Sequence, residues 1–264
     1  MKGERRRLDL ALVALGLAPS REKAQALVMA GDVTVDGQPA RKAGQTVAVA
    51  ARLAVRPQTN RVGRGALKLL GALDAFAVDP AGRVAIDVGA STGGFTEVLL
   101  ERGARRVYAV DVGRAQLHER LRADPRVVVL EKTNARRLSP ELVPEPCSLA
   151  VMDVSFISVM KLLPPLLAVL AGGADALVLV KPQFEVGRAQ VGRGGLVKDP
   201  LLQQGAIARV ALSSRKSGYA VLGARASVVR GATGNREFFL WLRKSDGGLP
   251  PDEIEALAQA AVAA

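Results

Sequence analysis

The segment D-V-G-A-S-T-G-G-F, from Asp87 to Phe95, decides how the largest part of this chain folds. Alternating apolar residues predict a strand over Arg83–Asp87, and the apolar spacing after the turn predicts a helix over Gly93–Arg102. Glycines between them let the backbone turn sharply and approach a ligand at the strand end. The spacing matches neither G-x-G-x-x-G nor a G-K-[ST] phosphate loop.

The same alternation of strand and helix continues along the chain. It predicts an α/β fold, a Rossmann-like, mostly parallel sheet covered by helices on both faces, whose last strand is antiparallel. The further strands expected are Val107–Asp111, Val127–Leu130, Leu149–Asp153, Ala176–Val180, Tyr219–Arg225 and, last, Phe238–Leu242.

The polar residues near the turn favour one kind of cofactor. A carboxylate before the turn, Asp87, suits a ligand with an ammonium group, which S-adenosylmethionine has and dinucleotides lack. Asp111 ends the next strand, where a carboxylate can accept hydrogen bonds from ribose hydroxyls, and Asn134 follows the third strand, near an adenine edge. A purely structural tight turn is the alternative. The candidate cofactor-binding residues are Asp87, Gly89, Ala90, Ser91, Thr92, Gly93, Gly94, Phe95, Asp111 and Asn134.

Composition restricts the chemistry. One cysteine, Cys147, excludes an internal disulfide framework, and one histidine, His118, argues against a zinc site, so we expect no metal. Residues 1–66 hold 12 Lys/Arg against 5 Asp/Glu, a net of +7 out of +12 for the whole chain. This concentration favours a module that binds a polyanion.

The N-terminal quarter predicts two short helices and then a hairpin turn at Asp36-Gly37. The first helix lies within Leu8–Leu17 and is stopped by Gly16, and the second is capped by Ser20. The motifs R-L-D, G-L-A-P-S-R and G-D-V-T-V-D-G resemble the small RNA-binding domain of ribosomal protein S-four. A generic helical hairpin with solvated arginines is the alternative. The candidate RNA-binding residues are Arg5, Arg6, Arg7, Arg21, Lys23, Arg41 and Lys42, with Arg61 and Arg64 in the linker and Arg188 and Arg193 in a glycine-rich loop, 187–195.

The predicted organisation is an RNA-binding domain over 1–58, a linker over 59–65, a catalytic domain over 66–245 and a C-terminal tail over 246–264, for which no function is predicted. The apolar stretch Leu162–Val180 is interrupted by prolines, glycines and Asp175, so it predicts a helix, a turn and a buried strand, not a membrane span. No secretory signal is visible at residues 1–10, and we expect the chain in the cytoplasm.

Three polar features stand near the expected sheet edge. Asp153 ends the fourth strand, Lys181 follows the fifth, and a cation against that buried strand needs a partner or a purpose. Lys68 lies off the apolar stripe of a helix, where an ordinary solvated lysine is the simpler interpretation. Glu237 opens an aromatic strand and could be its exposed end.

A resemblance combines these features. R-G-A-L-K-L, D-V-G-A-S-T-G-G-F-T-E-V-L-L, A-V-D-V-G, T-N-A-R, D-V-S-F-I-S, V-K-P-Q-F-E-V-G and G-N-R-E-F-F-L-W-L resemble, in order, the TlyA/hemolysin A family, which joins the RNA-binding domain to an FtsJ-like methyltransferase domain. The resemblance implies a Lys-Asp-Lys-Glu tetrad at Lys68, Asp153, Lys181 and Glu237. The family's aromatic linker residue is replaced here by Arg61-Val62-Gly63.

The resemblance also implies S-adenosylmethionine-dependent 2'-O-methylation of cytidine in large-subunit rRNA, and leaves small-subunit rRNA open as a second substrate. Our hypothesis makes Lys181 the base or alkoxide stabiliser, with Asp153 orienting it and Glu237 steadying Lys68. Two alternatives are a non-catalytic RNA-binding or ribosome-assembly protein with a methyltransferase-like fold, and a cytolysin. The predicted partners are rRNA or ribosomal subunits.

Overall fold

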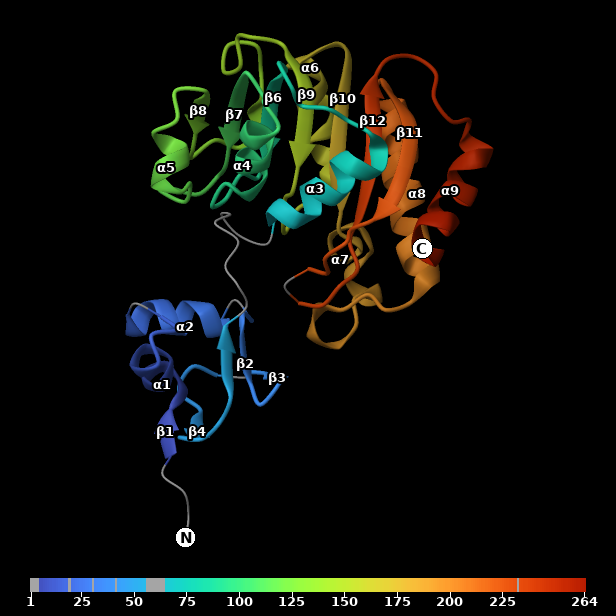
Figure 1. The fold of residues 1–264 in the computed structure, drawn as a ribbon. Coiled ribbons are helices and arrows are strands. Elements are labelled where there is room, and N and C mark those ends of the chain that lie inside the picture. Colours follow the sequence, from blue (N-terminus) through green and yellow to red (C-terminus); the bar gives the residue numbers. More distant parts are fainter. Residues whose placement is uncertain (1–4, 19, 30, 41, 56–64, 232) are drawn as a thin grey trace. The chain divides into compact units, whose positions relative to one another are not determined.

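The computed structural model describes residues 5–18, 20–29, 31–40, 42–55, 65–231 and 233–264. The chain divides into two compact units, Met1–Asn60 and Arg61–Ala264 (Figure 1). Each unit has its own hydrophobic core.

The N-terminal unit packs two helices, α1 (Leu8–Ala14) and α2 (Arg21–Met29), against short strands. Strand β2 (Val33–Val35) pairs with β3 (Gln38–Pro39) and β5 (Leu53–Val55), and β1 (Arg5–Arg7) pairs antiparallel with β4 (Thr46–Ala48). The hairpin predicted at Asp36-Gly37 is present, with φ of 50° and 81° as a tight two-residue turn requires.

One prediction for this unit is confirmed and one detail differs. The first helix ends at Ala14, and Gly16, which was predicted to stop it, adopts a left-handed φ of 68°. The arginine triplet Arg5–Arg7, expected only as a source of cations, forms a strand. All three side chains of this short edge strand are exposed, so their charges remain in contact with water. Edge strands therefore tolerate charged residues.

The second unit is built on a seven-stranded sheet in the order β11-β12-β10-β9-β6-β7-β8. Its strands are β6 (Val84–Val88), β7 (Arg106–Val110), β8 (Val127–Leu130), β9 (Cys147–Met152), β10 (Leu170–Val180), β11 (Tyr219–Ala226) and β12 (Phe238–Lys244). The β6, β7, β8, β9 and β10 neighbours pair in parallel, and β12 is antiparallel to β10 and β11. The predicted fold class, with its antiparallel last strand, is confirmed.

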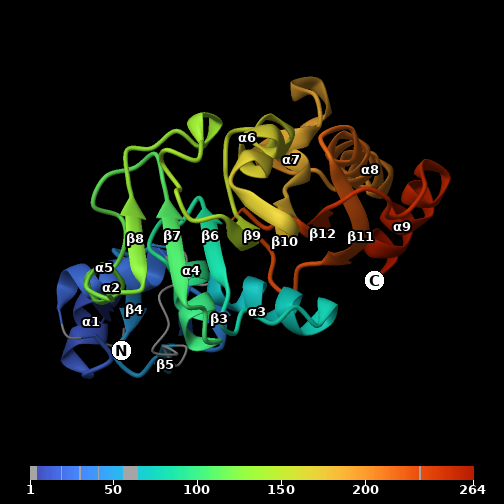
Figure 2. The same cartoon turned by 90° about the horizontal axis from the view of Figure 1, so that it is seen from above.

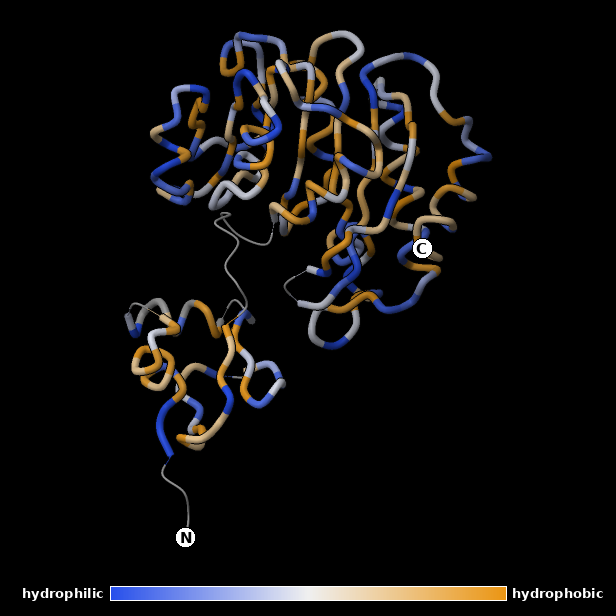
Figure 3. Tube along the Cα trace, in the orientation of Figure 1, coloured by the Kyte–Doolittle hydropathy of each residue, from blue (hydrophilic) through white to orange (hydrophobic). Residues whose placement is uncertain are grey.

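Helices cover both faces of this sheet. Figure 2 shows α3 (Gly65–Phe76) and α4 (Gly94–Glu101) on one side, and α6 (Leu163–Ala168) and α8 (Pro200–Lys216) on the other. The shorter helices are α5 (Glu119–Arg122) and α7 (Pro182–Glu185), and 3-10 turns lie at Ala135–Arg137, Val159–Lys161, Arg188–Gln190 and Arg193–Gly195. Hydrophobic residues follow the strands and hydrophilic ones gather in the loops (Figure 3). Two apolar layers therefore enclose the sheet.

Two segments of this unit need comment. We expected Gly172 and Gly173 to separate a helix from a strand. Instead they lie inside the long strand β10, whose register with β9 shifts between Leu170 and Asp175. The last segment forms helix α9 (Pro251–Ala263), which buries Ile254 and Ala258 in the same core as β11 and α8. Among the described helices, none combines the length and the apolar character needed to cross a membrane.

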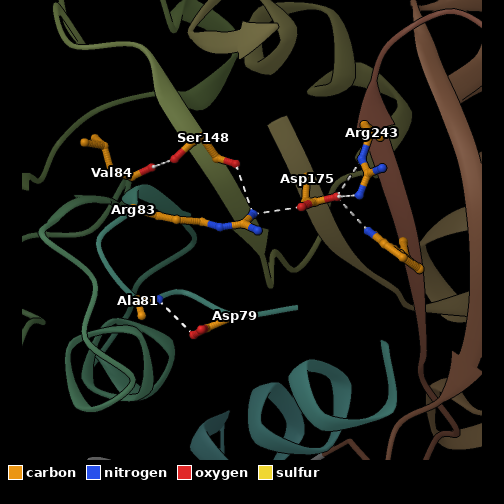
Figure 4. Close-up of polar contacts among 8 residues, drawn as sticks. Asp79, Ala81, Arg83, Val84, Ser148, Asp175 and Arg243 are labelled. Carbon is orange, nitrogen blue, oxygen red and sulfur yellow. Dashed lines mark hydrogen bonds and ion pairs between the residues drawn. The ribbon is translucent and has the colours of Figure 1, made fainter. Parts of the chain in front are cut away.

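Asp175 ties strands together in the middle of β10, where the pairing of β10 with β12 begins (Figure 4). Its carboxylate accepts hydrogen bonds from Arg83 (2.8 Å), the Trp241 indole (2.9 Å) and Arg243 (2.8 and 3.0 Å). Burial alone would raise the pKa of Asp175, but these donors outweigh it and hold the pKa below its ordinary value. A single buried carboxylate thus connects residues from three parts of the sheet.

We predict that Asp175→Asn lowers the free energy of unfolding by about 2 kcal/mol, because two arginines lose their charged acceptor. The loss should appear in urea denaturation at neutral pH. It should shrink as the pH falls below about 4, where the native carboxylate also begins to lose its contribution. Asp74→Asn, which removes the exposed partner of Arg102, is the control and should change stability little. Equal stabilities of native and Asp175→Asn protein would contradict this role.

Candidate active site

The turn after β6 lies directly against the end of β9. Gly89 has a φ of 88°, and a Cβ there would lie 2.4 Å from the backbone oxygen of Asp153. The Gly89 and Ala90 amides donate to the Val110 carbonyl at 2.9 and 3.1 Å. Only glycine therefore allows this close approach, which brings the turn and Asp153 to the same edge of the sheet.

A cavity of about 410 Å³ opens at this edge. Gly89, Ser91, Asp111 and Asn134, all predicted from the sequence, line it together with Asp153. Its other lining residues are Val88, Val110, Val112, Gln116, Thr133, Ala135, Val154, Ser155, Phe156, Ile157 and Leu162. A mostly apolar pocket with a few polar groups at the carboxyl ends of parallel strands is where ligands of α/β folds bind.

The polar groups of the cavity are already oriented by the backbone. One Asp111 oxygen accepts the Ser91 amide at 2.8 Å and the other accepts the Gly113 amide at 2.7 Å. The Asn134 oxygen caps the 3-10 turn through the Arg136 amide at 3.1 Å. These contacts hold both side chains in place before any ligand arrives.

Asp87 lies deeper than we expected. It is fully buried, does not line the cavity, and accepts a hydrogen bond from the Thr96 hydroxyl at 2.7 Å. Within the described residues its Oδ1 atom accepts none. Burial raises the pKa of Asp87 to about 7, helped by the nearby carboxylate of Asp153 and opposed by Thr96. The turn residues that do not line the cavity are Ala90, Thr92, Gly93, Gly94 and Phe95.

Two of these have structural tasks instead. Gly93 precedes α4 with a φ of 102°, and a Cβ there would collide with Leu121 at 2.2 Å. Phe95 is buried and stacks on Phe239, with ring centroids 6.2 Å apart. Both residues build the turn and the helix that follows it.

Four charged side chains meet beside the cavity. The Lys68 ammonium donates to Glu237 at 2.6 Å and lies 3.5 Å from one Asp153 oxygen, while the Lys181 ammonium lies 2.6 Å from the other. These side chains are between 3% and 18% exposed. Asp153 therefore bridges two lysines, and two positive charges face two negative ones in a nearly dry space.

The positions of Lys68 and Glu237 settle two open alternatives. Lys68, from α3, is not a solvated helix lysine, and Glu237 is not an exposed strand end, because both are buried and paired. They are separated by 169 residues along the chain. Glu237 also lies against Gly231, where a Cβ would come within 2.4 Å of its carboxylate.

Sequence reasoning missed Ser155, which contacts this group, and Glu185, which holds the loop that carries Ser155. Ser155 accepts a hydrogen bond from Lys181 at 2.8 Å. Glu185, on α7, accepts the Ser158 hydroxyl at 2.6 Å and the Val159 amide at 2.9 Å, and burial raises its pKa. Ser155 follows Asp153 closely in the sequence, and Glu185 follows Lys181 closely. This closeness, after the ends of two strands, was the signal in the sequence that could have found them.

The expected cationic residues have different environments. Arg5 and Arg6 lie on exposed β1, whereas Arg7 and Arg21 both pair with the fully buried Asp9 at 2.9 and 3.0 Å. Lys42, Arg188 and Arg193 are exposed. The last two lie in the 187–195 loop, whose end is tied to Asn235 through Gly195 at 2.8 Å. Outside the described residues lie Arg41, Arg61, Arg64 and the side chain of Lys23.

Comparisons with known proteins agree with this geometry. The family model of the FtsJ-like methyltransferases matches residues 61–244, and that of the S4 domain matches residues 6–53. The chain is 49% identical, over 98% of its length and 97% of the relative's, to the 16S/23S rRNA (cytidine-2'-O)-methyltransferase TlyA of Mycobacterium tuberculosis. It is 35% identical, over 88% and 97%, to Hemolysin A of Brachyspira hyodysenteriae.

A solved structure from Streptococcus thermophilus that carries a hemolysin name is 38% identical and superposes with a TM-score of 0.76, covering 97% of this chain and 95% of that one. Both domains and nearly the whole length are thus shared with these relatives. The chain therefore belongs to the TlyA/hemolysin A family of FtsJ-like methyltransferases, as its motifs predicted.

Proposed function

We propose that this chain transfers a methyl group from S-adenosylmethionine to the ribose 2'-oxygen of cytidine in ribosomal RNA. The observation that carries the proposal is the Lys181–Asp153 ion pair beside the cavity formed by the Gly89 turn. The Mycobacterium tuberculosis relative is named as a methyltransferase of both 16S and 23S rRNA, which supports the RNA of both ribosomal subunits as substrates. Such an enzyme works where ribosomes are assembled, in the cytoplasm.

The cavity suits the proposed cofactor. Asp111 presents a carboxylate for the ribose hydroxyls, and Asn134 an amide for the adenine edge, and Gly89 keeps the floor of the cavity free of a side chain. Asp87 is too deep to contact a ligand directly, so we propose that it shapes the turn through Thr96. When bound, S-adenosylmethionine supplies a methyl group already activated by a sulfonium.

The four charged residues supply the acceptor chemistry. A ribose 2'-hydroxyl is barely acidic, so its proton must pass to a base as the oxygen attacks. We propose that the Lys181 amine takes this proton, or stabilises the alkoxide, while Asp153 holds the amine beside the cavity. Lys68, held by Glu237, keeps Asp153 in place from its other oxygen. Alignment of the reacting atoms supplies most of the remaining acceleration.

Lys181→Ala should lower kcat for methyl transfer to rRNA by at least about 100-fold, because no base remains at the acceptor oxygen. The affinity for S-adenosylmethionine, measured by calorimetry, should change less than about threefold, since Lys181 does not line the cavity. Radiolabelled methyl transfer to ribosomal subunits and to free rRNA measures kcat. Lys216→Ala, at the exposed end of α8, is the control. Undiminished turnover by Lys181→Ala would contradict the role of Lys181 as base or alkoxide stabiliser, and with it the proposed mechanism.

The N-terminal unit is the proposed RNA anchor. Arg5 and Arg6 are exposed on β1. Asp9 forms ion pairs with Arg7 and Arg21 and not with these two residues. The Arg5 guanidinium donates to the Thr46 carbonyl at 2.8 Å, which leaves its other N–H groups exposed. Two exposed guanidinium groups on an edge strand can contact successive phosphates. Arg7 and Arg21 are instead proposed to hold the domain together, with their exposed faces available to RNA.

Replacing Arg5 and Arg6 together by Gln should weaken rRNA binding at low salt, because two phosphate contacts are lost. The slope of log affinity against log salt concentration should become shallower by about 1 to 2. Fluorescence anisotropy with an rRNA fragment over a salt series measures it. Replacing Arg102 by Gln, an exposed arginine paired with Asp74, is the control. An unchanged slope would remove β1 from the RNA interface.

A further inference from the structure

Ser155 stands next to the proposed base without belonging to the Lys-Asp-Lys-Glu group. It follows Asp153 by two residues in the loop after β9, and its side chain is exposed at the cavity. Its hydroxyl oxygen accepts a hydrogen bond from the Lys181 ammonium at 2.8 Å. The contact joins the loop after β9 to the residue that follows β10, beside the cavity.

The two partners of Lys181 act differently on its nitrogen. The Asp153 oxygen, at 2.6 Å, forms an ion pair, and charge attraction fixes where Nζ lies but depends only weakly on direction. A hydrogen bond is directional, so the contact with Ser155 sets the rotation about the Cε–Nζ bond. With one N–H fixed on Ser155, the remaining tetrahedral positions are left to Asp153 and to the substrate hydroxyl.

We propose that Ser155 is a positioning residue that turns the Lys181 amine so that its lone pair faces the ribose 2'-hydroxyl. This inference rests on the proposed methyl transfer. Before that step the Lys181 ammonium gives up one proton to solvent, which leaves a neutral amine with a lone pair. In the step itself the hydroxyl proton moves to Nζ, the 2'-oxygen forms a bond to the methyl carbon, and the carbon–sulfur bond breaks with its electrons on sulfur. Ser155 gains or loses no proton. It determines how often the lone pair is correctly aimed.

The surrounding loop keeps Ser155 at this distance. Phe156, the next residue, has a left-handed φ of 64°. Ser158 and Val159 are both held by the buried Glu185, which lies four residues after Lys181. The loop that carries Ser155 and the segment that carries Lys181 are therefore fastened to each other on the far side of the contact. Such fastening is what a geometric role requires.

Ser155→Ala should lower kcat for rRNA methylation by about 10- to 100-fold, because the amine loses its orientation but remains present. The KM for rRNA and the affinity for S-adenosylmethionine should stay within about twofold, as expected of an interaction used only in the transition state. Ser155→Thr keeps the hydroxyl and should recover most of kcat. Ser148→Ala, which removes a hydroxyl near the other end of β9, is the matched control and should behave as native protein.

A second readout is independent of activity. Lys181 of the unliganded chain can be acylated with a small amine-reactive reagent at fixed pH, and the labelling rate followed by peptide mass spectrometry. This rate should be several-fold higher in Ser155→Ala than in native, Ser155→Thr or Ser148→Ala protein. An unchanged labelling rate would show that Ser155 does not hold Lys181, and a Ser155→Ala kcat within about twofold of native would overturn its positioning role. If the native chain methylates no rRNA, the proposed function fails, and the labelling comparison alone decides whether Ser155 holds the amine.

Discussion

The rest of the site depends on one constraint, the neutralisation of two buried ammonium groups by the buried carboxylate of Glu237 and the largely buried carboxylate of Asp153. Burying any one of these charges alone would cost several kcal/mol, so none of Lys68, Asp153, Lys181 and Glu237 can be placed without its partner. They come from α3, from the ends of β9 and β10, and from the start of β12. The fold must therefore bring four elements together at one sheet edge, and the antiparallel direction of β12 lets Glu237, the residue just before that strand, reach the edge at which β10 ends.

The opposite end of the sheet shows the complementary arrangement. Asp175 lies where β10 begins to pair with β12, and it holds the two strands together through Arg243 and Trp241. The paired part of β10 is thus fixed by charge at both ends, by Asp175 at its start and by Lys181 just after its end. At the Asp175 end the arginines are partly open to water and serve structure. At the Lys181 end the group borders a cavity and is available for chemistry, which is why the same kind of interaction has two different consequences.

The sequence alone could predict those parts of the fold and the candidate site that depend on residues close together in the chain. The strands around the Gly89 turn were predictable because apolar periodicity and glycine placement are local, and so was the edge shared by Asp153 and Lys181. The burial of Lys68 and Glu237 was not, since each is buried by a partner 169 residues away, and only the family resemblance indicated it. Asp87 was predicted to bind the cofactor. Every residue of its strand β6 is buried, so its depth follows from the cover on both faces of the sheet, which no local pattern in the sequence shows. Ser155 and Glu185 contact residues of other segments, so apart from their closeness in sequence to Asp153 and Lys181 no local pattern indicated their contacts.

The central claim is that this charged group and the cavity beside it methylate ribose in ribosomal RNA. The most direct measurement is a nucleotide-resolution map of ribose methylation in rRNA from a strain that lacks this protein, compared with its parent and with the strain complemented by the native gene. The account predicts that at least one 2'-O-methylcytidine is lost in the mutant and restored on complementation. An identical pattern of ribose methylation in all three strains would contradict it.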